Sequence, residues 1–97
     1  MNASRMYEII YTTKYKKDYK RIKSNTILKD EINTAVNLLY RSDLPLPENY
    51  NDHQLKGKYT EYRECHIRPD WLLVYRKKQK ELILMLTRTG THSHIFG

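Results

Sequence analysis

Four histidines, one aspartate and one arginine are the side chains of this sequence that most need a chemical explanation. They are His53, His66, Asp70, Arg88, His92 and His94. Histidine exchanges a proton near neutral pH, and arginine binds a phosphate through two parallel hydrogen bonds. Phe96, in the same C-terminal segment, can stack on a nucleobase. Together these residue types indicate chemistry on an RNA backbone.

Metal-independent cleavage of RNA needs three functions. A base activates the ribose 2′-OH, an acid protonates the departing 5′ oxygen, and a cation stabilises the charge on the phosphate. Histidine and aspartate can serve as base and acid, and Arg88 suits the cation. Each residue also has a plainer explanation. His66 could be a hydrogen-bonded packing residue, Asp70 could cap the turn at Pro69, and Arg88 could be a surface cation.

Two other chemistries fit the sequence poorly. His92-Ser93-His94 and Cys65-His66 supply zinc-ligand residue types, but paired Cys-x-x-Cys or His-x-x-x-His spacings are missing. Cys65 is a poor candidate nucleophile, because on a strand it points to the face opposite His66. We therefore expect no metal site and no cofactor.

The periodicity of the apolar residues predicts four strands and two helices in the order β-α-α-β-β-β. The strands are expected at Met6–Tyr11, Tyr62–Ile67, Trp71–Tyr75 and Leu82–Leu86. The first helix is expected from Thr12 or Thr13 to Lys23, and the second from Ser24-Asn25-Thr26 to Tyr40. An irregular loop is expected at Ser42–Asp52 and a hairpin connection at Arg76–Glu81. This pattern predicts an α+β domain, in which a helical hairpin covers one face of a mostly antiparallel four-stranded sheet. Strand ends and turns can converge at one edge of such a sheet, so the candidate residues could meet there.

The composition favours a nucleic-acid partner. The 97 residues suit one domain, 1–97, and carry a net charge of +7. Residues 1–52 hold nine Lys or Arg against seven Asp or Glu, a balance of +2, whereas residues 53–97 hold nine against four, a balance of +5. A basic surface attracts a phosphate backbone and releases its counterions.

The sequence also bears on where the protein is found. No apolar run approaches the roughly 20 residues that span a bilayer. A single cysteine suits the reducing cytoplasm.

Three blocks of this sequence occur together in a known family. They are Asp52–Gly57, Tyr62–Tyr75 and Arg88–Gly97. Over nearly its whole length the chain resembles the YafQ-type toxins of the RelE/ParE superfamily of bacterial toxin–antitoxin systems. The resemblance implies a RelE-like fold and an mRNA interferase that cuts messenger RNA during translation in the ribosomal A site. The implied reaction leaves a 2′,3′-cyclic phosphate and a 5′-OH.

The resemblance also implies which positions are functional. They are His53, His66, Asp70, Trp71, Arg88, His92 and Phe96. We expect His92 to be the general acid and Arg88 to clamp the phosphate, with the base left open between Asp70 and His66. His53 would support the site.

The remaining expectations concern RNA contacts and residues outside the chemistry. Phe96 would orient a base by stacking, although it could instead pack into the core and hold the C-terminus in place. Trp71 would also contact RNA, unless it packs against the sheet. Lys56 and Lys58 on a loop are candidate phosphate contacts, although they could simply be solvated. His94 has no matching role and is expected at the surface.

The family resemblance implies partners as well. A cognate antitoxin would bind through an acidic, partly disordered segment, and operator DNA would be contacted only through that antitoxin. The ribosome and mRNA are the other expected partners. Two alternatives stay open: a non-enzymatic ParE-like inhibitor of DNA gyrase, and a generic basic RNA-binding domain. Neither would need the set of histidine, aspartate and arginine residues.

Overall fold

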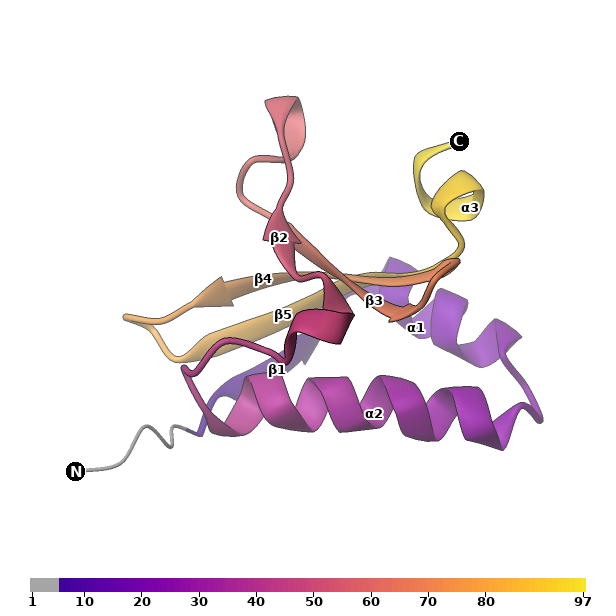
Figure 1. The fold of residues 1–97 in the computed structure, drawn as a ribbon, viewed down its shortest axis with the longest axis horizontal. Coiled ribbons are helices and arrows are strands. Elements are labelled where there is room, and N and C mark those ends of the chain that lie inside the picture. The colour runs from indigo at the N-terminus through magenta and orange to yellow at the C-terminus, as the bar shows by residue number, and fades with distance from the viewer. Residues whose placement is uncertain (1–5) are drawn as a thin grey trace.

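The sheet has five strands and not the four that the sequence predicts (Figure 1). In the computed structural model, which describes residues 6–97, the strands lie in the order β1-β5-β4-β3-β2. Their bounds are β1 Glu8–Tyr11, β2 His53–Gln54, β3 Arg63–Arg68, β4 Trp71–Lys78 and β5 Ile83–Gly90. β1 and β5 are parallel, and the other neighbours are antiparallel. The α+β class and the mostly antiparallel sheet are therefore confirmed.

The additional strand, β2, consists of His53 and Gln54 and pairs with β3. Two residues cannot show an alternating pattern, so no periodicity in the sequence marks this strand. It follows the predicted loop, in which Glu48–Tyr50 form one 3-10 turn, η1. The strand places His53 opposite Glu64 at the edge of the sheet. The first five residues of the predicted domain lie outside the described part of the chain.

The helices α1 (Thr13–Arg21) and α2 (Thr26–Arg41) form the predicted hairpin on one face of the sheet (Figure 1). Each has a capping residue that the sequence analysis anticipates. The side chains of Thr12 and Asn25 accept hydrogen bonds from the backbone three residues further on, at 3.0 and 3.1 Å. The face of α2 toward the sheet buries Leu28, Ile32, Ala35, Val36 and Leu39. Within residues 6–97, no helix has the length and apolar character needed to cross a membrane.

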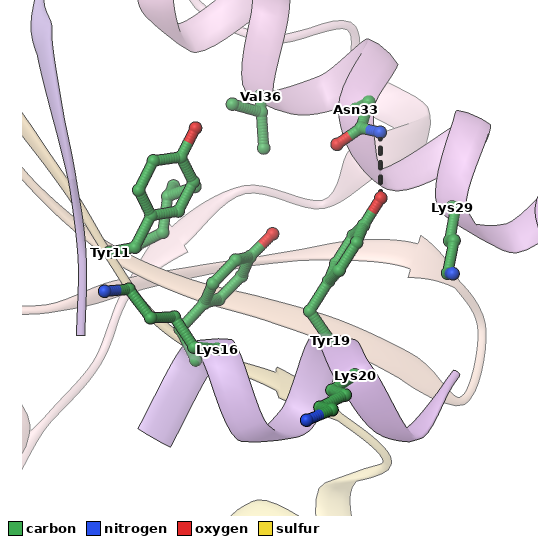
Figure 2. Close-up of a pocket in the computed structure, with 9 residues that line it drawn as sticks. Tyr11, Lys16, Tyr19, Lys20, Lys29, Asn33 and Val36 are labelled. Atoms are coloured by element: carbon green, nitrogen blue, oxygen red, sulfur yellow. Dashed lines mark hydrogen bonds between the residues drawn. The ribbon is translucent and has the colours of Figure 1, made fainter. Parts of the chain in front are cut away.

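Three tyrosines from β1 and α1 stand between the two helices around a pocket of about 510 Å³ (Figure 2). Tyr15 is buried, whereas Tyr11 is 48% exposed. The hydroxyl of Tyr19 accepts a hydrogen bond from the Asn33 amide at 3.1 Å. Tyr15 thus belongs to the core and Tyr19 packs against it, whereas Tyr11 is largely exposed.

Strands β4 and β5 extend further than the apolar runs predict. Arg76–Lys78 continue β4 as half-buried residues paired with β5, so the turn is confined to residues 79–82. Leu82 closes this turn with a φ of 56°. At its other end β5 reaches Gly90, so that Arg88 lies within the strand rather than at its end. Cross-strand pairing therefore extends beyond the residues whose hydrophobicity marks the strands.

A short third helix, α3 (His92–Phe96), follows β5 and is absent from the prediction. Its cap is Thr91, whose hydroxyl accepts a hydrogen bond from the backbone of His94 at 3.2 Å. Both α3 and the segment that contains β2 and the 3-10 turn η2 (Gly57–Tyr59) rise from the sheet on the side away from α2 (Figure 1). These two projections border the region that contains most of the candidate residues.

Candidate active site

The register of the strands places three of the candidate residues on the sheet face away from α2. His53 pairs with Glu64, Glu64 pairs with Val74, and Val74 pairs with Arg88. Paired residues lie on the same face of a sheet. Residues two apart on one strand also share a face, so His66 lies on the same face as Glu64. This sheet face, together with α3 and η2, is called the open face below.

Cys65 points to the opposite face, as predicted, and belongs to the core between the sheet and the helices. It is 0% exposed. Burial raises the pKa of its thiol to about 12, with smaller contributions from Asp52 and Glu64. A thiol that is both inaccessible and protonated cannot act as a nucleophile.

A pocket of about 250 Å³ opens on the open face between α3, η2 and the sheet. The residues that line it are Lys14, Tyr59, Tyr62, Val74, Thr87, Arg88, Ile95 and Phe96. It combines an arginine and a lysine with three aromatic rings. Cations and aromatic faces are the groups that bind phosphates and bases of single-stranded nucleic acid.

Aromatic contacts connect α3 to η2 at this pocket. The rings of His92 and Phe96 lie 5.1 Å apart, and Phe96 meets the edge of Tyr59 at 5.5 Å. His92 is exposed and Phe96 half-buried. Phe96 is thus a pocket-lining residue rather than a core residue.

The two lysines of the loop, Lys56 and Lys58, are exposed beside this pocket on either side of Gly57. The ammonium of Lys58 stands 5.3 Å from the centre of the Tyr59 ring, within the range of a cation–π contact. Because Tyr59 lines the pocket, Lys58 places a positive charge at the margin of the pocket.

Glu64 lies between two of the predicted histidines. Its Oε2 atom is 3.1 Å from Nε2 of His53 and 3.7 Å from Nε2 of His66. The Glu64 side chain is buried, and its Oε1 atom has no hydrogen-bond partner among residues 6–97. The sequence analysis did not select Glu64. Its spacing of two residues from His66 on one strand was the available signal.

The backbone orients both histidine rings. Nδ1 of His53 lies 2.8 Å from the carbonyl of Asn51, and Nδ1 of His66 lies 3.3 Å from that of Pro69. A carbonyl oxygen only accepts, so Nδ1 donates in each ring and the lone pair of a neutral ring is on Nε2. Nε2 of both rings lies within ion-pair distance of Glu64, whose carboxylate can compensate the positive charge of an imidazolium. A histidine–carboxylate cluster of this kind can take part in proton transfer.

Arg88 is not a solitary surface cation, because it forms a forked ion pair with Asp18 of α1. The Arg88 Nε and Nη2 atoms lie 2.7 and 3.1 Å from the two carboxylate oxygens. Asp18 also accepts hydrogen bonds from the backbone of Thr89 at 3.1 Å and from Nε2 of His94 at 3.2 Å. Burial raises the pKa of Asp18, but these hydrogen bonds outweigh it and hold the pKa below its usual value.

This ion pair involves two residues to which the sequence analysis gave no role. His94 is exposed, as expected, but its Nε2 bonds to the buried Asp18 and lies 3.4 Å from Nη1 of Arg21. Asp18 was not predicted at all. Its position in a lysine-rich helix resembles an ordinary solvated charge, and only the fold brings it to Arg88, 70 residues along the chain.

The structure does not bring Asp70 and Trp71 into this pocket. Asp70 is exposed in the turn between β3 and β4, and its side chain makes no hydrogen bond or ion pair with the described residues. Trp71 lies on the helix side of the sheet, partly packed against the core. Its indole N–H donates to the hydroxyl of Thr89 at 2.8 Å. These contacts are those of a packing residue.

The arrangement supplies the parts that RNA cleavage requires. Histidines beside a buried carboxylate can move protons, a fixed guanidinium can stabilise a phosphate, and aromatic rings can hold a base. Within residues 6–97, no group of three or more His, Cys, Asp or Glu side chains is arranged to hold a metal ion.

Comparisons with known proteins agree with this chemistry. Residues 7–97 match the family described as the bacterial toxin of type II toxin–antitoxin systems, YafQ. The mRNA interferase toxin YafQ of Escherichia coli K12 is 38% identical over 90 residues, which cover 93% of this chain and 96% of that protein. The E. coli DinJ–YafQ toxin–antitoxin complex contains a chain with 35% identity and a TM-score of 0.84, covering 96% of this chain and 100% of that one. A metal-bound toxin from Helicobacter pylori has 41% identity and a TM-score of 0.78, covering 94% and 100%.

Proposed function

Because this chain belongs to the YafQ family of toxins of bacterial type II toxin–antitoxin systems, we propose that it is an mRNA interferase that cleaves translated messenger RNA. The observation that carries the proposal is the open face itself. His53, His66 and Arg88 lie on this one side of the sheet, where Arg88 and Phe96 line the same pocket. A gyrase inhibitor would need none of these proton-transfer groups, and the relatives cited above do not favour that alternative.

In the proposed reaction the RNA supplies its own nucleophile. A base removes the proton of the ribose 2′-OH, and the 2′ oxygen forms a bond to the adjacent phosphorus. The bond from phosphorus to the 5′ oxygen breaks, and an acid delivers a proton to that oxygen. The products are a 2′,3′-cyclic phosphate and a 5′-OH, so that no metal or external oxidant is required.

We assign the base to His66 in preference to Asp70. Nε2 of His66 lies 3.7 Å from the Glu64 carboxylate, which can compensate the charge of the imidazolium that forms in the reaction. Asp70, by contrast, stands exposed in its turn, and no side-chain bond to a residue among 6–97 holds its orientation. His53 supports the site by sharing Glu64 with His66.

The other half of the reaction falls to the C-terminal segment. His92 is proposed as the acid, since it is exposed on α3 beside the pocket-lining Phe96. Arg88 clamps the phosphate with the part of its guanidinium that Asp18 does not occupy. Phe96 stacks on a base, and Lys56 and Lys58 attract the RNA backbone. Trp71 serves packing in this assignment.

The proposed partners follow from the relatives and the charge. E. coli YafQ forms a complex with DinJ, and we propose that this chain likewise has a cognate antitoxin. An acidic, partly disordered segment of that antitoxin would complement a net charge of +7. The ribosome would present the message, operator DNA would be contacted through the antitoxin alone, and the site of action would be the cytoplasm.

Primer extension on messenger RNA after induction tests the function. Wild type is expected to create new 5′ ends within translated regions, and His92→Ala to abolish them. Ser93→Ala, an exposed neighbour on the same helix, is the matched control and should cleave like wild type. If wild type produces no new ends, or His92→Ala produces the same ends, the catalytic assignment is wrong. A supercoiling assay run in parallel would detect inhibition of gyrase.

A further inference from the structure

Asp18 is a buried carboxylate of α1 that accepts hydrogen bonds from β5 and α3. Its two oxygens receive hydrogen bonds from the guanidinium of Arg88, the backbone of Thr89 and the ring of His94. The side chain is only 4% exposed. Removing a carboxylate from water is costly unless its partners are well placed. The carboxylate is therefore held at a defined position by groups from β5 and α3.

The geometry at Arg88 indicates what this defined position does. Asp18 is bonded to the backbone of β5 through Thr89, so its position relative to the strand is fixed. It occupies Nε and one N–H of Nη2, and the remaining three N–H groups of Arg88 make no hydrogen bond within the described residues. Arg88 also lines the pocket on the open face, which Asp18 does not. Because Asp18 holds the Nε side of the guanidinium, it also sets the direction of the N–H groups of Arg88 that it does not bind.

The contact with His94 extends this effect to α3. His94 lies on α3 between His92 and Phe96, and its ring bonds to the same oxygen of Asp18 that Nη2 of Arg88 contacts. Asp18 thus connects three elements that are far apart in sequence. Two of them, β5 and α3, carry the proposed clamp and the proposed acid.

We propose that Asp18 is a positioning residue, which fixes the guanidinium of Arg88 toward the pocket and holds α3 in place through His94. This inference rests on the proposed function, because it assigns Asp18 a part in the same reaction. The low pKa of Asp18 agrees with it, since the carboxylate stays charged at neutral pH. Orientation of reacting groups is a large part of catalysis, and small displacements cost rate.

The charge of Asp18 makes the inference distinguishable from a purely structural role. In wild type the carboxylate offsets the charge of Arg88, so Asp18→Asn increases the positive charge at the pocket while releasing the guanidinium. RNA binding should therefore persist or tighten, whereas the chemical step slows. A loss of folded protein would instead reduce the active fraction without tightening binding.

The test measures cleavage of a translated message at increasing toxin concentration. For Asp18→Asn we expect the maximal rate to fall by roughly 10- to 100-fold while the half-saturating concentration stays equal or falls. Asp30→Asn, an exposed aspartate on α2, is the matched control and should behave like wild type. His94→Ala, which keeps the ion pair but removes the contact with α3, should give a smaller loss of rate.

Nuclear magnetic resonance of the arginine Nε–H groups supplies a second measurement that does not depend on activity. The Arg88 signal should be protected from exchange in wild type and lose that protection in Asp18→Asn. Arg68, whose Nε donates to Glu31 at 2.6 Å, serves as the internal reference.

The outcomes separate the two proposals. A wild type that cleaves no message overturns the proposed function and this inference with it. An active wild type with an equally active Asp18→Asn, or with an unchanged Arg88 signal in that variant, overturns the inference alone. A slower rate with retained binding and a lost Arg88 signal supports it.

Discussion

At the scale of single residues, Glu64 is the group whose environment is most unusual. It is 7% exposed, contacts two histidines, and has an oxygen without a hydrogen-bond partner in the described part of the chain. An unpartnered buried oxygen costs stability, on the order of 1–3 kcal/mol. The proposed role explains why such a group is useful, because the same carboxylate stabilises the imidazolium that forms when His66 accepts a proton.

Glu64→Gln should therefore separate activity from stability. We expect the cleavage rate to fall by about tenfold or more, since an amide cannot compensate the charge of the imidazolium. The free energy of unfolding should change by less than about 1 kcal/mol, because removal of a buried charge offsets the lost pairing. Primer extension and urea unfolding measure the two quantities, and Glu81→Gln, exposed in the β4–β5 turn, is the control. An active variant would exclude Glu64 from the mechanism.

At the scale of elements, the junction of β5 with α3 decides where the C-terminal residues lie. Gly90 is the last residue of the strand, and a Cβ atom there would meet Cδ2 of His94 at 3.0 Å. That separation is tighter than an ordinary contact. The absence of a side chain at Gly90 thus lets α3 fold back far enough for His94 to reach Asp18.

Gly90→Ala should displace His94 and loosen α3. Crowding of this kind costs about 1–3 kcal/mol of unfolding free energy, and cleavage should slow because His92 and Phe96 move with the helix. Gly90→Ala combined with His94→Ala should be less destabilised than the sum of the two single variants, since the collision disappears. Thermal unfolding of the four proteins measures this coupling. Strictly additive losses would show that the close approach is not the cause.

At the scale of the whole molecule, the two sides of the sheet are specialised. The helical hairpin covers one side and provides the hydrophobic core, and the open face carries the pocket, the histidines and the loop lysines. Of the cations in residues 53–97, Arg88 and the loop lysines Lys56 and Lys58 lie on the open face. An electrostatic contribution to RNA binding follows from this placement.

Binding to a short single-stranded RNA should weaken by roughly tenfold or more between 50 and 200 mM salt. Replacing Lys56 and Lys58 by alanine should reduce the slope of log affinity against log salt by roughly 1, because fewer counterions are released. The control removes two exposed lysines elsewhere, Lys17 and Lys80, and should leave the slope nearly unchanged. Fluorescence anisotropy at several salt concentrations measures the slopes. Equal slopes for all three proteins would exclude the loop lysines from the interface.

The sequence by itself determined the elements that have a local signal. Alternation and 3.6-residue periodicity identified four strands and two helices, and the segments Thr12-Thr13 and Ser24-Asn25-Thr26 marked the helix starts, because these patterns depend on near neighbours. The elements that it missed, β2 and α3, have two and five residues and are too short for a periodic pattern. Pairing likewise extended β4 and β5 beyond their apolar runs.

The candidate site also consists of residues that the sequence indicates and residues that only the fold reveals. Residue types and the family motifs selected His53, His66, Arg88 and Phe96 as candidates without the fold. Only the tertiary structure placed Glu64 between two histidines and joined Asp18 to Arg88 across 70 positions of the chain. The physical reason is that a charged residue on a helix has the same local pattern whether it faces water or a distant strand. Its partner is decided by the packing of the whole chain.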